Sequence, residues 1–176
     1  MAYINASSEA NRVKLVIVKT EFDDGEPIAP VVGDFTGNDA IVIPGLQDVT
    51  LNNANGSFRW KQLDQSGESV ITTNATNSLS GNFVLDPSAF FGDTGAAGAA
   101  LDGIFKLSNE RTQVDFYLAP SGDTAVGDNK VFMGNGFISA LAPTVSADSP
   151  VWVSPITIEV NGDYAVGTVT VEAPAP

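Results

Sequence analysis

The chain has 176 residues, a length that suits one domain with a single hydrophobic core. With 43% hydrophobic residues, 16% charged residues, 17 glycines and 10 prolines, its composition excludes wholesale disorder and argues against a helical bundle. The net charge of −13 argues against nucleic-acid binding, and the absence of cysteine and histidine removes disulfides, sulfur metal sites and the commonest general base.

The first part of the chain predicts one strand and then a long acidic segment. Residues 12–20 are rich in β-branched side chains and predict the first strand. Residues 22–45 contain three prolines and five acidic residues, and only residues 40–43 among them resemble a strand. A connection of this length inside a domain is usually functional. We interpret it as an arm that reaches a partner, with a solvated acidic loop as the alternative.

Two Asn-Gly dipeptides predict tight hairpins. The first, at residues 55–56, lies between the β-rich segments 46–54 and 57–63, and the second, at residues 161–162, lies between segments 150–160 and 163–171. Asn-Gly is favoured in two-residue type I′ turns, where both central residues need a positive φ angle. Further strands are predicted at residues 68–73 and 77–85, where Gly81 indicates a bulge or a close approach of two backbones.

The middle of the chain predicts helix and then strand again. Asp86 followed by Pro87 is typical of a helix start and predicts a short helix at residues 87–91. A longer helix is predicted at residues 96–109, because apolar or small residues recur there at spacings of three and four. They are Ala97, Ala100, Leu101, Ile104, Phe105 and Ser108.

Strands at residues 112–119 and 130–141 complete a pattern of eight to ten strands, and residues 172–176 are expected to be a frayed tail. The predicted fold class is therefore mainly β: an antiparallel two-sheet β-sandwich or barrel with one flanking α-helix, in a single domain over residues 1–176.

The motifs predict neither an enzyme nor a cofactor. No phosphate-binding loop is present, and Gly134 and Gly136 lie within a predicted strand, where glycine permits a bend or a close approach. No serine has a histidine or a suitably spaced lysine to activate it, so we expect no catalytic residue. No metal site is predicted, although two acidic groups have the oxygen ligands that calcium accepts. These groups are Asp23, Asp24 and Glu26, and Asp123 and Asp128.

A carbohydrate-binding module is an open alternative, because exposed aromatic rings can stack on sugars. Aromatic residues in alternating strands are more often part of the core. The aromatic candidates for such a platform are Tyr3, Trp60, Tyr117, Trp152 and Tyr164.

The second half of the chain carries a family resemblance. Residues 134–166 (GNGFISALAPTVSADSPVWVSPITIEVNGDYAV) combine a strand with aromatic and small residues, a Ser/Asp/Pro junction and a strand that ends in Gly-Asp. Residues 102–119 (DGIFKLSNERTQVDFYLA) precede them as a helix followed by a strand. This order resembles the major tail tube proteins of long-tailed, siphovirus-like bacteriophages, at the level of pattern over roughly residues 45–170.

The resemblance implies the tail tube fold and a structural function in the virion. Copies would close into hexameric rings, and the rings would stack into a hollow tube that conducts DNA during ejection, similar to the tubes of contractile tails and of type VI secretion. The implied partners are sister copies and the tape measure, tail terminator and distal tail proteins. DNA would pass without specific binding. The protein would be made in the bacterial cytoplasm without a membrane anchor, and would reside in the virion tail.

The same resemblance suggests which residues meet other molecules. In the family the N-terminus and a long loop reach the adjacent ring, which points to the acidic segment. The inter-ring candidates are Asp23, Asp24, Glu26, Asp34 and Asp39. Basic residues are scarce, so those that meet acidic groups of another subunit should be few. The candidates are Arg59, Lys61 and Arg111.

An inner wall that faces DNA should be acidic, because negative charge keeps the polyanion from adhering. A ring of six chains would carry six times the charge of −13. Asp115 and Glu159 alternate with apolar neighbours on their strands and are the lumen candidates, with ordinary solvent-facing charge as the alternative. Completion of unpaired strand edges by neighbouring copies would drive assembly. Another virion β-sandwich, such as a head decoration or tail terminator protein, remains the main competing hypothesis.

Overall fold

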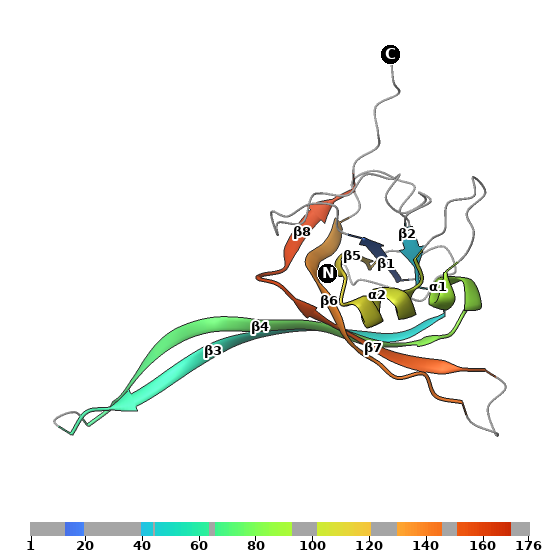
Figure 1. Cartoon of the computed structure of the whole chain (residues 1–176). Helices are drawn as coiled ribbons and strands as arrows, with labels where there is room; N and C mark the ends of the chain where they lie inside the picture. The colour runs from blue at the N-terminus through green and yellow to red at the C-terminus, as the bar shows by residue number, and fades with distance from the viewer. Residues whose placement is uncertain are drawn as a thin grey trace, which may run out of the picture.

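The computed structural model of the chain describes residues 13–19, 40–43, 45–63, 66–92, 102–120, 130–145 and 151–169 (Figure 1). In these ranges the chain forms eight strands and two short helices. Neither of these two helices has the length and apolar character needed to cross a membrane. The elements are β1 (Lys14–Lys19), β2 (Ala40–Val42), β3 (Leu46–Lys61), β4 (Glu68–Val84), α1 (Pro87–Phe91), α2 (Ile104–Glu110), β5 (Gln113–Ala119), β6 (Lys130–Leu141), β7 (Val153–Val160) and β8 (Ala165–Thr168).

All described strand pairs are antiparallel, which confirms the predicted mainly β class. Hydrogen bonds join the strands in the order β2-β1-β5-β6-β7-β4-β3, and β8 pairs with β6 as well. The strands thus form one continuous sheet, and α1 and α2 lie together against one side of it (Figure 1).

The main core lies between the two ends of this sheet and the helices. Leu15 of β1 and Ile158 of β7 belong to the same buried cluster although two strands, β5 and β6, lie between β1 and β7 in the sheet. The sheet must therefore curve around its own apolar face. Phe90 of α1 and Ile104 and Leu107 of α2 close the open side of this cluster. Each such buried side chain stabilises the fold by about 1.5–3 kcal/mol.

A smaller buried cluster lies on the opposite face, beside β1, β5 and β6. Its members are Val16, Tyr117, Ala119, Val131, Met133 and Val169.

The two predicted hairpins are wrong. Asn55 and Gly56 lie inside β3, at a register shift opposite β4, and neither has the positive φ angle that a type I′ turn requires. The chain reverses only between Lys61 and Glu68, so the four strands predicted here are two long ones. At the second dipeptide only Gly162 has a positive φ, of 89°. There β7 and β8 pair one after the other with β6 and run in the same direction, so no hairpin forms.

The short helix α1 is confirmed at its predicted bounds, with Asp86 as its N-cap and Pro87 in its first turn. The longer helix is wrong at its start, because α2 begins at Ile104 after an extended Gly103. A Cβ atom at Gly103 would lie 2.4 Å from the carbonyl oxygen of Phe90, so the backbone passes closely over the end of α1 before it turns into α2. The predicted members Ala97, Ala100 and Leu101 lie outside the described residues.

The predicted close approaches at strand glycines are confirmed. A Cβ atom at Gly81 would lie 2.5 Å from the carbonyl oxygen of Asp48, and one at Gly136 would lie 2.1 Å from that of Glu159. At Gly134 a Cβ atom would meet the ring of Phe116 at 2.6 Å. Glycine at these positions lets β6 and β4 pack tightly against their neighbours.

We expect Gly136→Ala to lower the free energy of unfolding by about 1–3 kcal/mol, because the added methyl group would collide with backbone that cannot move aside. Gly67→Ala is the matched control, since a Cβ atom at Gly67 meets nothing within 4 Å and its φ angle is not positive. Urea unfolding followed by circular dichroism measures both variants. Equal stability of the two would contradict the close approach at Gly136.

Candidate assembly surface

Four adjacent strands carry one polar face. Residues directly opposite each other in antiparallel strands lie on the same face of the sheet, so the register defines rows of side chains across β6, β7, β4 and β3. We call these rows the polar sheet face. They are Phe137, Glu159, Ser78 and Asn52; then Ala140, Thr157, Ser80 and Thr50; and then Pro155, Asn82 and Asp48. No residue in these rows is basic, and two are acidic.

The opposite face of the same four strands is sealed by the core. Ile138, Ile158 and Leu79 alternate with the polar residues along their strands and are at most 2% exposed. The polar sheet face is therefore the side of this part of the sheet that meets water. On it the side-chain amide of Asn82 donates to both carboxylate oxygens of Asp48, at 2.9 and 3.1 Å.

Both borders of this four-stranded section lack a strand partner among the described residues. β3 pairs with β4 alone, so its outer edge is unpaired. β5 pairs with β6 only as far as Phe137, which leaves the outer side of residues 138–141 without a neighbouring strand. Such edges present backbone N–H and C=O groups that can pair with another chain.

The two lumen candidates share the polar side of the sheet. Glu159 lies in the first row and is exposed, and the hydroxyl of Ser139 donates to its carboxylate at 3.5 Å. Asp115 pairs with Asn135, which lies two residues from Phe137 on β6 and so faces the same way. Asp115 is half-buried, and the Asn135 amide donates to its carboxylate at 2.6 Å.

The structure brings two of the three basic candidates together. Arg59 and Lys61 lie two residues apart on β3 and therefore on one face of the strand, opposite Val70 and Glu68. The Arg59 guanidinium lies 3.9 Å from the Glu68 carboxylate, and both groups are exposed. Arg111 lies apart from them at the C-cap of α2, in the left-handed conformation with a φ angle of 54°.

The acidic inter-ring candidates from Asp23 to Asp39 and both calcium candidate groups lie outside the described residues. Within the described part of the chain, no three acidic residues gather in a group that could hold a metal ion.

The structure does not gather the aromatic candidates into one platform. Tyr117 is buried in the smaller cluster, whereas Tyr164 packs edge-on against Phe116 at 6.2 Å between ring centroids. Trp60 lies near the end of β3, and Trp152 precedes β7 at the other end of β4. Tyr3 lies outside the described residues.

Solved structures of several phage-like tails share this architecture. The chain aligns with the SPP1 tail tube at a TM-score of 0.59 and 11% identity, over 94% of this chain and 80% of that one. The chain has the fold of a tail tube protein. It also aligns with a chain in the tail of an empty gene transfer agent particle, resolved with C6 symmetry, at a TM-score of 0.52 and 12% identity over 86% and 93% of the two chains.

A chain in the virion of the native gene transfer agent particle aligns at a TM-score of 0.50 and 12% identity, over 74% of this chain and 89% of that one. No protein-family profile and no curated protein matches the sequence, so the likeness lies in the fold. The tail tube fold that the resemblance over roughly residues 45–170 implies is thereby confirmed.

One structural contact of this tail tube fold was missed in the sequence. The hydroxyl of Tyr164 donates to the carbonyl oxygens of Ser78, at 2.5 Å, and Asn52, at 3.2 Å. The buried amide of Asn77 donates to the carbonyl oxygen of Gly162 at 2.8 Å. These bonds fasten the segment between β7 and β8 to β4 and β3, next to the first row of the polar sheet face. The sequence between β7 and β8 is typical of a turn. It gives no signal that Tyr164 contacts Ser78, which is 86 residues away in the chain.

We expect Tyr164→Phe to lower the free energy of unfolding by about 1 kcal/mol at pH 7, because it removes a hydroxyl that hydrogen-bonds to backbone carbonyls. Burial raises the pKa of the Tyr164 phenol above its ordinary value of 10.0. The phenol therefore ionises more easily in the unfolded chain, and its contribution to stability is present below pH 10 and lost as the pH rises through the raised pKa.

Urea unfolding of both proteins between pH 7 and pH 11 measures this contribution. The difference between wild type and Tyr164→Phe should shrink above pH 10. A variant as stable as wild type, with the same alkaline decline, would show that the hydroxyl does not fasten this segment.

Proposed function

We propose that this chain is a structural, non-catalytic tail tube protein whose copies join edge to edge into rings that stack into a hollow tube for DNA. The observation that carries the proposal is the four-stranded section with a covered apolar face, a polar face without basic residues and two unpaired borders. In a single copy the two borders have no strand to pair with. In a ring, each border would pair with a border of a neighbouring copy.

Ring closure follows from the two different borders. The outer edge of β3 in one copy would pair with residues 138–141 of β6 in the next, which is a head-to-tail contact. Repeated with a rotation, this contact closes a ring and leaves neither of these two borders unpaired. The C6 symmetry of the gene transfer agent tail supports six as the ring number.

The polar sheet face would then line the lumen, because the helices and the core occupy the other side of the sheet. Its acids Asp48 and Glu159, with Asp115 beside them, would repel DNA phosphates during passage. The acidic segment from Asp23 to Asp39 would reach the adjacent ring. Exposed ion pairs contribute only about 0–1 kcal/mol each, so the scarce bases would orient subunits rather than hold them together.

Electron microscopy of the concentrated pure protein tests this function. We expect hollow rods of stacked rings, because one copy offers both borders and association should continue without limit. Isolated rings that never stack would favour a tail terminator. Particles that stay monomeric at every concentration would refute the proposal.

Reversal of charge on the polar sheet face should affect DNA passage but not assembly. We expect particles that carry Asp115→Lys and Glu159→Lys to assemble tails and to eject their genome several-fold more slowly, because lysine ammonium groups in the lumen would bind phosphates. DNA release from triggered particles, followed by dye fluorescence, measures the rate.

Single substitutions provide the matched control for this experiment. Glu159→Lys and Glu110→Lys change the charge equally at exposed positions, but Glu110 lies at the end of α2, away from the polar sheet face. Only Glu159→Lys should slow ejection. Equal rates for the two would remove Glu159 from the inner wall.

A further inference from the structure

Two exposed apolar surfaces of this chain lie at opposite ends of β4. We infer that they bind each other between copies: the aromatic face of the β3–β4 ribbon of one copy seats on the apolar pocket beside α1 of another. The inference rests on the proposed self-assembly and names a second contact for it, separate from the pairing of strand edges.

The first surface belongs to a two-stranded ribbon that leaves the body of the protein (Figure 1). Residues 54–61 of β3 pair with residues 68–76 of β4, whereas β7 joins β4 only from Ser78 onward. At about 3.3 Å per residue, the ribbon extends roughly 30 Å beyond the three-stranded part of the sheet. A two-stranded ribbon has little stability of its own in water, so a surface that covers this one would stabilise it.

The two faces of the ribbon differ in character. Phe58 and Ile71 lie opposite each other and are 55% and 50% exposed, and Trp60 follows on the same face. The rings of Phe58 and Trp60 stack at 6.0 Å between centroids with planes 21° apart. The other face carries Arg59, Lys61, Val70 and Glu68. One face is thus built for an apolar partner and the other for water.

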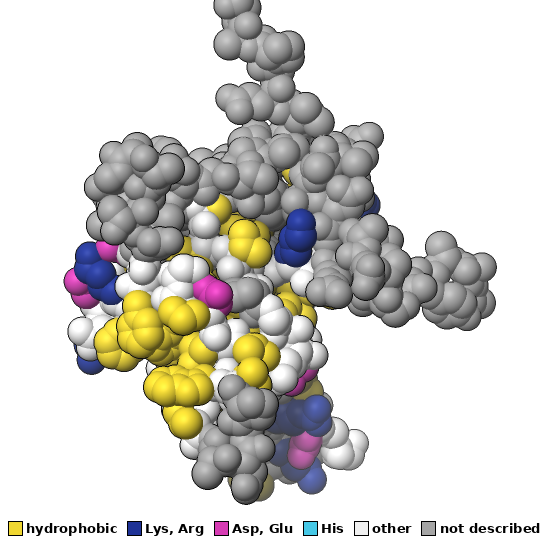
Figure 2. All heavy atoms as spheres, turned by 90° about the vertical axis from the view of Figure 1, so that its right-hand side faces the viewer, with side chains coloured by type: hydrophobic (Ala, Val, Ile, Leu, Met, Phe, Trp, Pro, Cys, Tyr) yellow, Lys and Arg dark blue, Asp and Glu magenta, His cyan; other side chains and the backbone are white. Residues whose placement is uncertain are grey.

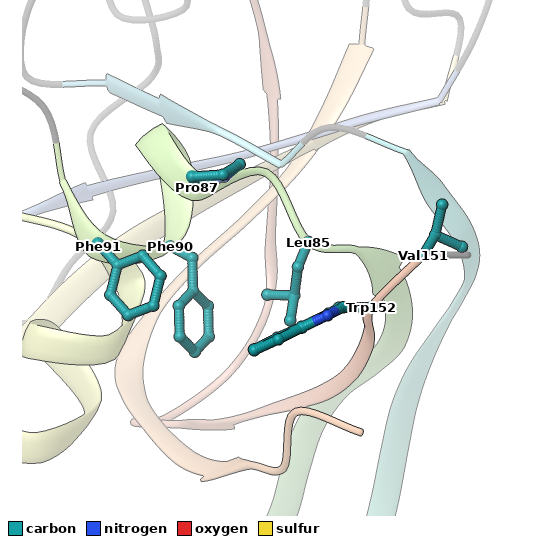
Figure 3. A pocket seen from close by; sticks show the side chains of 6 residues that line it. All are labelled: Leu85, Pro87, Phe90, Phe91, Val151 and Trp152. Atoms are coloured by element: carbon teal, nitrogen blue, oxygen red, sulfur yellow. The ribbon is translucent and has the colours of Figure 1, made fainter. Parts of the chain in front are cut away.

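The second surface is a pocket of about 390 Å³ between α1 and the start of β7 (Figure 3). Its rim is strongly exposed, with Phe91 at 66% and Trp152 at 49%. Hydrophobic side chains gather on this side of the molecule in Figure 2. The pocket is lined by Leu85, Pro87, Phe90, Phe91, Val151 and Trp152. Contiguous exposed apolar surface of this kind marks an interaction site.

Charge at the edges of the two surfaces is complementary. Arg59 and Lys61 flank Trp60 in the sequence, although the chain as a whole has a net charge of −13. At the pocket, Asp86 lies between two lining residues and caps α1 with its carboxylate. The hydrogen bond from the Ser88 hydroxyl lowers the pKa of Asp86, so this carboxylate is negative at neutral pH. The ribbon therefore carries two basic side chains on the face opposite its aromatic rings, against one acidic residue, Glu68, while the pocket has an acidic group beside it.

A ribbon that seats on the pocket must belong to a second copy. β4 runs from Glu68 beside the ribbon tip to Val84, the residue before the pocket, a distance of about 50 Å at 3.3 Å per residue. The two surfaces of one chain are held apart by this strand and cannot meet. Because they differ, their contact is head-to-tail and propagates from copy to copy.

Cysteine cross-linking tests the contact with little background, because the chain contains no cysteine. The test variant carries Ile71→Cys on the aromatic face and Phe91→Cys at the pocket rim, both at exposed positions. The matched control carries Val70→Cys with Phe91→Cys; Val70 is 51% exposed on the opposite face of the ribbon. Full-length proteins are oxidised under tube-forming conditions, and circular dichroism checks their fold.

We expect a ladder of disulfide-linked oligomers from the test variant and at least tenfold less from the control. Tubes without a ladder would overturn this contact and leave the proposed function standing. A ladder without tubes would support the contact and refute the proposed function, and neither product would refute both. Equal ladders from the two variants would also overturn the contact, since it requires the aromatic face.

Discussion

The sheet depends on β6, the one described strand that pairs with three others. β5 occupies one side of it, and β7 and β8 follow each other along the other side. Because β6 pairs with all three strands, the two ends of the sheet can curve toward each other and enclose one core. It requires close packing of backbones, which Gly134 and Gly136 provide, because a methyl group at either position would collide with the Phe116 ring or the Glu159 carbonyl. A bulkier β6 would weaken its pairing with β5 and β7, and both of these strands contribute to the main core.

The pairing of β6 also explains why the polar sheet face takes no part in the core and is available for contacts with other molecules. The helices and the curved sheet cover the apolar face, so that Ile138 and Ile158 are buried inside the subunit. The side chains that alternate with them remain in water, and their backbone borders remain unpaired. A second copy can pair with these borders without disturbing the core. In the proposed ring, folding and assembly would therefore use different groups of the same strands, and a subunit could fold before it joins the ring.

The sequence was sufficient to predict the mainly β fold class and the positions of several strands and of α1. It was not sufficient to predict where the chain turns or which strands pair. A β-branched run located β1, and Asp86 with Pro87 located α1, because these signals act over a few residues. The hairpin prediction at Asn55-Gly56 was wrong because this dipeptide forms a turn only where the strands on both sides end. Here β3 continues through it to Lys61. The start of α2 was missed because contact of Gly103 with the end of α1 sets it. The shared face of Asp115 and Glu159 follows from alternation within strands, but their proximity depends on a register that only the folded sheet reveals.

Charge decides which surfaces of such a chain can touch. At a net charge of −13, copies repel one another over the Debye length of about 10 Å at 0.1 M salt, so association needs contacts that are short in range and do not bring acidic groups together. Strand borders satisfy this condition, because backbone groups carry no net charge. The ribbon satisfies it as well, since two of the eight basic residues of the chain, Arg59 and Lys61, lie on it. Glu159 of the polar sheet face lies on β7, between the two borders, and so stays outside both contacts. One sequence thus separates a repulsive surface, which suits a passage for DNA, from the attractive surfaces that would build the passage.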